Sequence, residues 1–208
     1  MKLTLKREGN VPGYVTVSML LSLFLASALA GIYGILHDQI TITISREYFL
    51  YFKGLEGAGL PDRIGAAYIG WISTWWVGFL ASYLLTLAFY FKKQSERLVK
   101  RTLAACLKII IFAAGFGLAG GLYGYGFPRE AGGGISFLFP MKVEAFFRFA
   151  LEYGVTDYRA FYSVWMIHLF GYWGGLAGLG YYMIKILKPK RDKNGGVDYG
   201  GQHHSDKG

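Results

Sequence analysis

The sequence predicts an all-α integral membrane protein, a four-transmembrane-helix bundle with both termini in the cytoplasm. Its composition is apolar, with 53% hydrophobic and only 17% charged residues, which is unusual for a soluble domain. Four segments have the roughly 20 consecutive apolar residues that cross a hydrocarbon core about 30 Å thick. Lys and Arg gather in alternate connections, as the positive-inside rule expects. These observations place the chain in a membrane as one domain, residues 1–190.

The four predicted spans contain no Asp, Glu, Lys or Arg in their central parts. The first of them includes Ala28-Leu29-Ala30, which has the small-residue spacing of a signal-peptidase site. Its apolar run exceeds the ~7–15 residues of a signal-peptide core, so we favour a retained span over cleavage near residue 30. The predicted spans are residues 14–36, 64–91, 103–127 and 161–187.

The charges orient these spans. The N-terminal arm, the connection around residues 92–108 and the C-terminal tail are basic, whereas residues 37–63 and 128–160 have almost balanced charges. The net charge of +9 is therefore a topology signal, and it indicates contact with anionic lipid at the cytoplasmic face rather than with nucleic acid. The tail, residues 191–208, is polar and Gly-rich, and we expect it to be disordered.

Each outer loop is predicted to carry a short amphipathic helix. In the first loop, residues 39–45 alternate β-branched and polar side chains, which favours a short strand, and Ser45 is a candidate N-cap for a helix from Arg46. In the second, a helix between Pro140 and Gly154 has one apolar and one charged face. Each half of the chain consists of a span, an aromatic-rich outer loop and a second span, which suggests a 2+2 parallel repeat.

Small residues recur at four-residue spacing in the spans. Such spacing lets helices approach closely in lipid, where packing replaces the hydrophobic effect. We interpret it as packing within the bundle, with a homo-oligomer face or a place in a larger membrane complex as the alternative. The candidate packing glycines are Gly117, Gly121, Gly171 and Gly175.

His168 is the one ionisable side chain well inside a predicted span. An unpaired ionisable group is costly in hydrocarbon, so such a residue indicates a functional site. The structural alternative is a neutral imidazole that is hydrogen-bonded to a neighbouring helix. His37 and Asp38 end the first span on the same outer side, and Glu47 and Arg63 follow in the first loop. These five residues form the candidate polar or ligand site.

Two histidines with one or two carboxylates are a ligand set for a divalent metal, and paired histidines on facing helices can ligate haem. The span boundaries place His37 and His168 one to two helical turns apart in depth, so neither metal nor haem is assigned and the cofactor stays unknown. The adjacent His203 and His204 lack further ligands. No nucleophile motif, CxxC pair or phosphate loop is present, so the chain is more simply a non-enzymatic protein.

Three stretches carry a resemblance to a known family. They are "GIYGILHDQITITISREYF" from Gly31, "RIGAAYIGWISTWWVG" from Arg63 and "MIHLFGYWGGLAG" from Met166. They resemble a family of small uncharacterised (hypothetical) bacterial four-span membrane proteins with a "GxxHDQITxxxSxEYF" loop and a fourth helix that contains His and Gly-Gly. Arg46 departs from the Pro that family members tend to have after the loop serine. The resemblance implies the topology and brings no activity.

The sequence thus favours a bacterial inner-membrane accessory, assembly or complex-subunit protein that acts through its outer loops near His37 and His168. One alternative is a small oligomeric transporter or channel. The other is a metal- or haem-binding membrane redox protein. A visible absorption spectrum with metal analysis would separate the last alternative from the first two.

The orientation is testable by labelling single-cysteine variants on a Cys106→Ala background. We expect a membrane-impermeant thiol reagent, added from outside, to react at Glu56→Cys and to spare Glu96→Cys and Gly195→Cys, because the last two positions lie in basic cytoplasmic segments. Reaction at position 96 or 195 in intact cells would contradict this topology.

Overall fold

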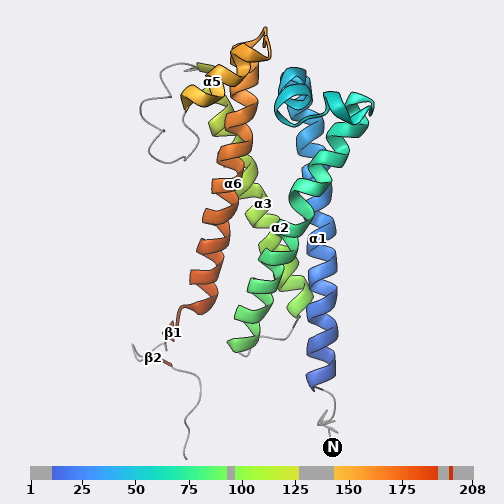
Figure 1. The fold of residues 1–208 in the computed structure, drawn as a ribbon. Helices are drawn as coiled ribbons and strands as arrows, with labels where there is room; N and C mark the ends of the chain where they lie inside the picture. Colours follow the sequence, from blue (N-terminus) through green and yellow to red (C-terminus); the bar gives the residue numbers. More distant parts are fainter. Residues whose placement is uncertain (1–10, 93–96, 127–142, 192–196, 199–208) are drawn as a thin grey trace, which may run out of the picture.

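Four long helices run side by side in the computed structural model, which describes residues 11–92, 97–126, 143–191 and 197–198 (Figure 1). They are α1 (Val11–Ile44), α2 (Asp62–Phe91), α3 (Leu98–Gly126) and α6 (Tyr158–Leu187). Short helical segments gather at one end of these helices, at the opposite end from the N-terminus (Figure 1). The first three helices thus reach beyond the predicted spans. α1 is longer than its predicted span at both ends, and α2 and α3 each begin earlier than predicted.

The helices pair as two antiparallel hairpins, α1 with α2 and α3 with α6. In the first hairpin the backbones touch at Gly34 and Gly70. A Cβ atom on Gly34 would lie 2.1 Å from the Gly70 carbonyl oxygen, so only glycine permits this approach. Thr74 Oγ1 then donates across the interface to Ala30 O at 2.9 Å. Close backbone contact and interhelical hydrogen bonding are the interactions that hold helices together in lipid.

The glycines of the second hairpin differ in what surrounds them. A Cβ on Gly121 would lie 2.5 Å from Ile167 Cγ1, and one on Gly117 would lie 3.1 Å from the Ile167 carbonyl oxygen, so both positions are tightly packed. The nearest atoms to a Cβ on Gly171 and Gly175 would be 3.7 and 3.9 Å away. Gly171 and Gly175 therefore differ from the expectation of close packing, and both line a cavity instead.

Two buried clusters join the hairpins at their ends. The outer cluster, named for the end of the molecule opposite the N-terminus (Figure 1), includes Tyr48, Phe49, Phe161, Val164 and Met166, which come from the first loop and the start of α6. The inner cluster brings together Ala26, Leu85, Leu98, Cys106 and Ile186 from all four long helices. The two hairpins contact each other far less than the helices within each hairpin do. The middle of the molecule is therefore where a cavity between the hairpins can form.

The first outer loop starts later than predicted, because α1 continues through residues 39–44 instead of giving way to a strand over residues 39–45. Thr41 Oγ1 donates to the His37 carbonyl and Thr43 Oγ1 to the Ile40 carbonyl, which fits threonine into a helix. Ser45 Oγ then accepts from Tyr48 N at 3.3 Å, as expected of a cap. The loop continues as the π-helix η1 (Tyr48–Phe52) and the 3-10 helix η2 (Glu56–Ala58).

The second outer loop contains the predicted helix, α5 (Val143–Glu152). The helix is followed by a turn at Gly154, whose φ of 65° is in the left-handed region that glycine favours. Val155 N donates to Ala150 O and Gly154 N to Leu151 O, the paired bonds of a Schellman motif. Pro140 and the proposed apolar side chains up to residue 147 lie outside the described side chains.

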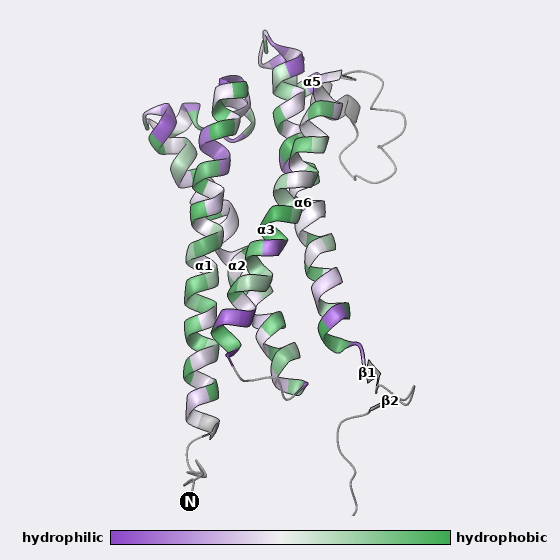
Figure 2. Ribbon diagram, turned by 180° about the vertical axis from the view of Figure 1, so that it is seen from behind, coloured by the Kyte–Doolittle hydropathy of each residue, from purple (hydrophilic) through white to green (hydrophobic). Residues whose placement is uncertain are grey.

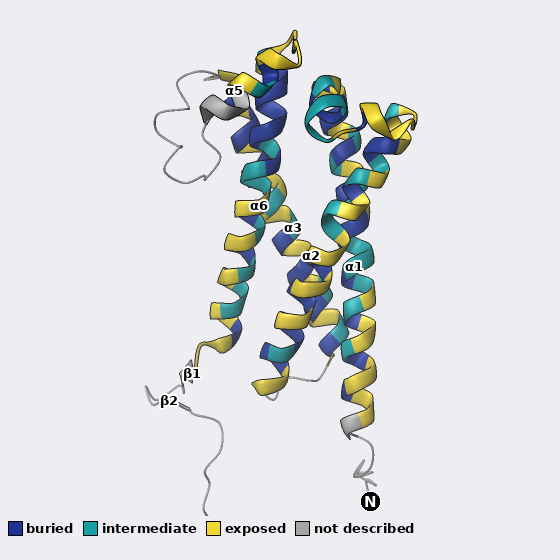
Figure 3. Ribbon diagram, viewed as in Figure 1, coloured by how far each residue is buried: buried dark blue, intermediate teal, exposed yellow. Residues whose placement is uncertain are grey.

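Among the described residues, three helices are long and apolar enough to cross a membrane: Gly13–Ile44, Asp62–Phe91 and Leu98–Gly126. Hydrophobic residues recur along the four long helices (Figure 2), and many residues of these helices are exposed (Figure 3). Phe24, Ile40, Leu118 and Leu122 on these helices are large apolar side chains that the described part of the chain leaves exposed. Helices that are apolar on their exposed faces are membrane helices. The chain is thus a helical membrane protein.

The C-terminal tail contains some regular structure. Strands β1 (Lys190–Arg191) and β2 (Val197–Asp198) pair antiparallel, with Lys190 opposite Asp198. This differs from the expectation of a tail without structure at those residues, and the tail's other residues from 192 onward lie outside the described ones.

Candidate functional site

His168 is buried in α6, with 8% of its surface exposed, and both ring nitrogens have partners. Nδ1 lies 2.8 Å from the Val164 carbonyl oxygen one helical turn earlier. Nε2 lies 3.1 Å from Oδ1 of Asp38 on α1, which is 3% exposed. Residues 130 positions apart in the chain are thus joined across the two hairpins.

The partners of His168 decide where its protons lie. A carbonyl oxygen only accepts hydrogen bonds, so Nδ1 carries a proton and donates to Val164 O. A neutral imidazole protonated at Nδ1 presents a lone pair at Nε2, which would repel an ionised carboxylate. A proton must therefore lie between Nε2 and Asp38 Oδ1, shared by the pair. The pair then has no net charge, which is the arrangement that a low-dielectric environment tolerates.

Aromatic rings surround this pair. The His37 ring meets the His168 ring edge to face, with centroids 4.9 Å apart. The Tyr48 ring of η1 stacks on the other side of His168 at 5.1 Å. Lys53 is held over Tyr48, and burial lowers the pKa of its amine even though the charge of Asp38 raises it. His37, Asp38 and His168 therefore form one compact group at the outer end of the bundle.

Sequence reasoning placed His168 too far from His37 in depth. The span boundary at residue 36 made His37 and Asp38 the start of a loop, one to two turns above His168. Since α1 continues to Ile44, both residues lie within the helix and at the level of His168. The predicted constellation of His37, Asp38 and His168 is brought together more closely than the sequence indicated.

Glu47 and Arg63 lie elsewhere. Glu47 Oε1 accepts from Thr156 N and Oγ1 at 3.0 and 2.7 Å, and Oε2 accepts from Asp157 N at 3.3 Å. Partial burial raises the pKa of Glu47, but these hydrogen bonds outweigh it and hold the pKa below its usual value. Glu47 thus ties the first loop to the start of α6, where Asp157 Oδ1 caps Ala160 N.

Arg63 joins the tops of α1 and α2. Its Nη1 donates to the Gln39 carbonyl at 2.7 Å, and Gln39 Nε2 donates back to the Arg63 carbonyl at 2.7 Å. Arg46 and Asp62 form an exposed ion pair beside them. These contacts set the position of α1 against α2. The candidate site therefore consists of His37, Asp38 and His168.

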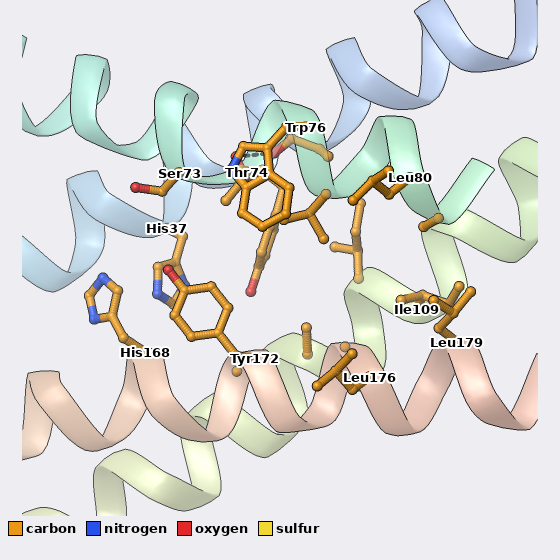
Figure 4. A pocket seen from close by; sticks show the side chains of 18 of the residues that line it. His37, Ser73, Thr74, Trp76, Leu80, Ile109, His168, Tyr172, Leu176 and Leu179 are labelled. Carbon is orange, nitrogen blue, oxygen red and sulfur yellow. Dashed lines mark hydrogen bonds between the residues drawn. The ribbon is translucent and has the colours of Figure 1, made fainter. Parts of the chain in front are cut away.

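The site forms the outer end of a cavity of about 440 Å³ between the hairpins. Figure 4 shows His37, His168, Tyr172 and Ser73 at one end of it and leucine side chains at the other. Sequence reasoning missed Tyr33 and Tyr172, which line the cavity. Each is four residues from a histidine, Tyr33 from His37 and Tyr172 from His168, so helical spacing is the signal that indicates them.

The three side chains suit a metal ion better than haem. One ligand atom from each of His37, Asp38 and His168 lies within 4.8 Å of the others. Two imidazoles and a carboxylate are ligands of first-row divalent metals. Two histidine rings in edge-to-face contact leave no room for a macrocycle between them, so the geometry does not fit a haem held between these histidines.

Comparison of the chain with protein-family models, with curated proteins and with solved structures finds no match. The resemblance to a bacterial membrane family therefore stays a prediction.

The shared proton predicts how substitutions at the pair affect stability. His168→Phe should lower the free energy of unfolding by about 1–3 kcal/mol, because Asp38 loses its partner in a buried site and Val164 O keeps only its helical hydrogen bond. Asp38→Asn should cost less than Asp38→Leu, since the asparagine amide can donate to Nε2 of a neutral imidazole. Unfolding followed in detergent measures both effects. Equal losses for Asp38→Asn and Asp38→Leu would contradict the shared proton.

Proposed function

We propose that the chain is a four-span accessory protein of the bacterial inner membrane, with both termini in the cytoplasm, that holds a divalent transition-metal ion near its outer face. The fourth span is α6. Its 30 residues extend about 45 Å at 1.5 Å per residue, and it runs alongside α3, a helix apolar enough to span. Glycines, tyrosines and His168 lower its hydropathy, while Leu176 and Ile184 on its exposed face suit lipid.

The observation that carries the metal proposal is that three potential ligand atoms lie close together. His37 and Asp38 are neighbours on α1, and His168 comes from α6, all within 4.8 Å. The bond from His168 Nδ1 to Val164 O orients the ring and leaves Nε2 to bind a metal. A carbonyl acceptor behind a coordinating histidine is the usual outer-shell arrangement at metal sites.

Asp38 supplies a second, independent observation. Its Oδ2 is buried and has no hydrogen-bond partner among the described residues. A buried carboxylate oxygen without a partner is unfavourable by about 1–3 kcal/mol or more, and a divalent cation bound to the carboxylate would satisfy it. The ion would take the place of the proton between Nε2 and Oδ1, and its charge would offset that of Asp38.

Three protein ligands beside a cavity leave a coordination position open. Structural zinc sites close all four positions with protein ligands, whereas three-ligand sites keep one for water or another molecule. His37, Asp38 and His168 all line the cavity, so an added ligand would approach from there. The proposed role is therefore to bind an ion that a further molecule can reach, and no reaction is assigned.

Zinc binding to metal-stripped protein in detergent tests this proposal. We expect one Zn²⁺ per chain by calorimetry and by elemental analysis after dialysis. His37→Phe, Asp38→Asn and His168→Phe should each weaken binding by more than the 10–100-fold typical of outer-shell changes, because each removes a direct ligand. Asp38→Asn is the most informative variant, since it is expected to keep the fold.

The chain offers a matched control in its tail. A variant with both His203→Ala and His204→Ala removes the other two histidines and should bind Zn²⁺ as the wild type does. Wild-type affinity in all three site variants, or a loss confined to the tail variant, would refute the proposed site.

A further inference from the structure

The cavity below the metal site is bounded by all four long helices. Its lining includes Ala30 of α1 and Ile109 and Ala113 of α3. Some of its α2 and α6 residues are exposed at the surface, Leu80 at 49% and Leu176 at 60%. The cavity therefore opens sideways between α2 and α6, where the exposed faces are apolar. A molecule in the bilayer could enter there without passing through water.

Polar groups are confined to one end of this cavity. The outer end has His37, Asp38, His168, Ser73 and Tyr172, and the labelled residues at the other end are apolar (Figure 4). Leu179 lies 11 residues beyond His168 in α6, which is about 16 Å further along the helix axis. A cavity with one polar end and a long apolar part matches a molecule with a polar head and a hydrocarbon chain.

The polar end also indicates which head group fits. The lining contains no Lys or Arg among the described residues, so nothing there would pair with a phosphate head group. It contains imidazoles, hydroxyls and the aromatic rings of Tyr33, Trp76 and Tyr172. Aromatic rings favour flat aromatic partners by stacking, and hydroxyl and imidazole N–H groups donate to carbonyl oxygens.

We propose that the cavity binds a lipid-soluble quinone, with its ring among Tyr33, Tyr172 and Ser73 and its chain along Leu80 and Leu176. The volume of about 440 Å³ is within the ~300–1,000 Å³ of small-molecule sites. The proposal concerns binding and includes no electron transfer. It goes beyond the metal site, because the cavity and its side opening exist whether or not an ion is bound.

Gly175 allows the cavity to be filled without disturbing the helices. It lines the cavity, and the nearest atom to a Cβ built on it is Ala113 Cβ at 3.9 Å. Gly175→Leu should therefore extend into the cavity. Gly180 on the same helix has no atom within 4 Å of such a Cβ and does not line the cavity, so Gly180→Leu is the matched control for an added leucine in α6.

The test measures binding of a decyl-substituted benzoquinone to the full chain in detergent, in the presence of a metal chelator, by calorimetry. We expect saturable binding to the wild type and to Gly180→Leu, and binding at least tenfold weaker to Gly175→Leu. Decanol, which has the chain without the ring, and phosphatidylglycerol should not displace the quinone.

Four results would overturn the proposal: no saturable binding to the wild type, wild-type affinity in Gly175→Leu, an equal loss in Gly180→Leu, or displacement by decanol or phosphatidylglycerol. Since the chelator removes metal, quinone binding that persists while zinc binding fails would refute the metal site alone. Zinc binding without quinone binding would refute the cavity proposal alone.

Discussion

The proton shared by His168 and Asp38 is the constraint around which the outer half of the molecule is arranged. An unpaired carboxylate or imidazolium at this depth would be strongly unfavourable, so the residues that carry them must meet. Their hydrogen bond, 3.1 Å between Nε2 and Oδ1, joins α1 of one hairpin to α6 of the other. Glu47 supports the same junction from the loop above, through its bonds to Thr156 and Asp157. The hairpins can therefore remain apart below the pair, where the cavity lies.

Much of the fold could be predicted from the sequence, because long apolar runs and helix caps are local signals. The four long helices, the capping bond of Ser45 and the turn at Gly154 all follow from residue type and spacing. The predicted strand over residues 39–45 was wrong, because its alternation of β-branched and polar residues is a local preference. Threonines that bond their own helix and an apolar outer face at Ile40 let α1 continue instead.

The site could be predicted only in part. The sequence indicated His168 because it is an ionisable residue inside a predicted span. It indicated His37 and Asp38 because they follow the first predicted span on the same side of the membrane. Their contact depends on how far α1 extends and on how the hairpins pack, which spacing alone does not define. Glu47 and Arg63 belong to the same outer surface but make other contacts. Gly175 has the spacing of a packing residue, yet it lines the cavity, whereas its neighbours Gly174 and Gly178 pack closely against α3.

The central claim is that His37, Asp38 and His168 act as one ligand set. X-ray absorption spectroscopy of the zinc-loaded protein tests it most directly, because the spectrum reports the atoms bound to the ion. The account predicts two imidazole nitrogens at about 2.0–2.1 Å and oxygen at about 2.0–2.2 Å. A first shell with sulfur, for which Cys106 is the only cysteine source, or one without imidazole would contradict it.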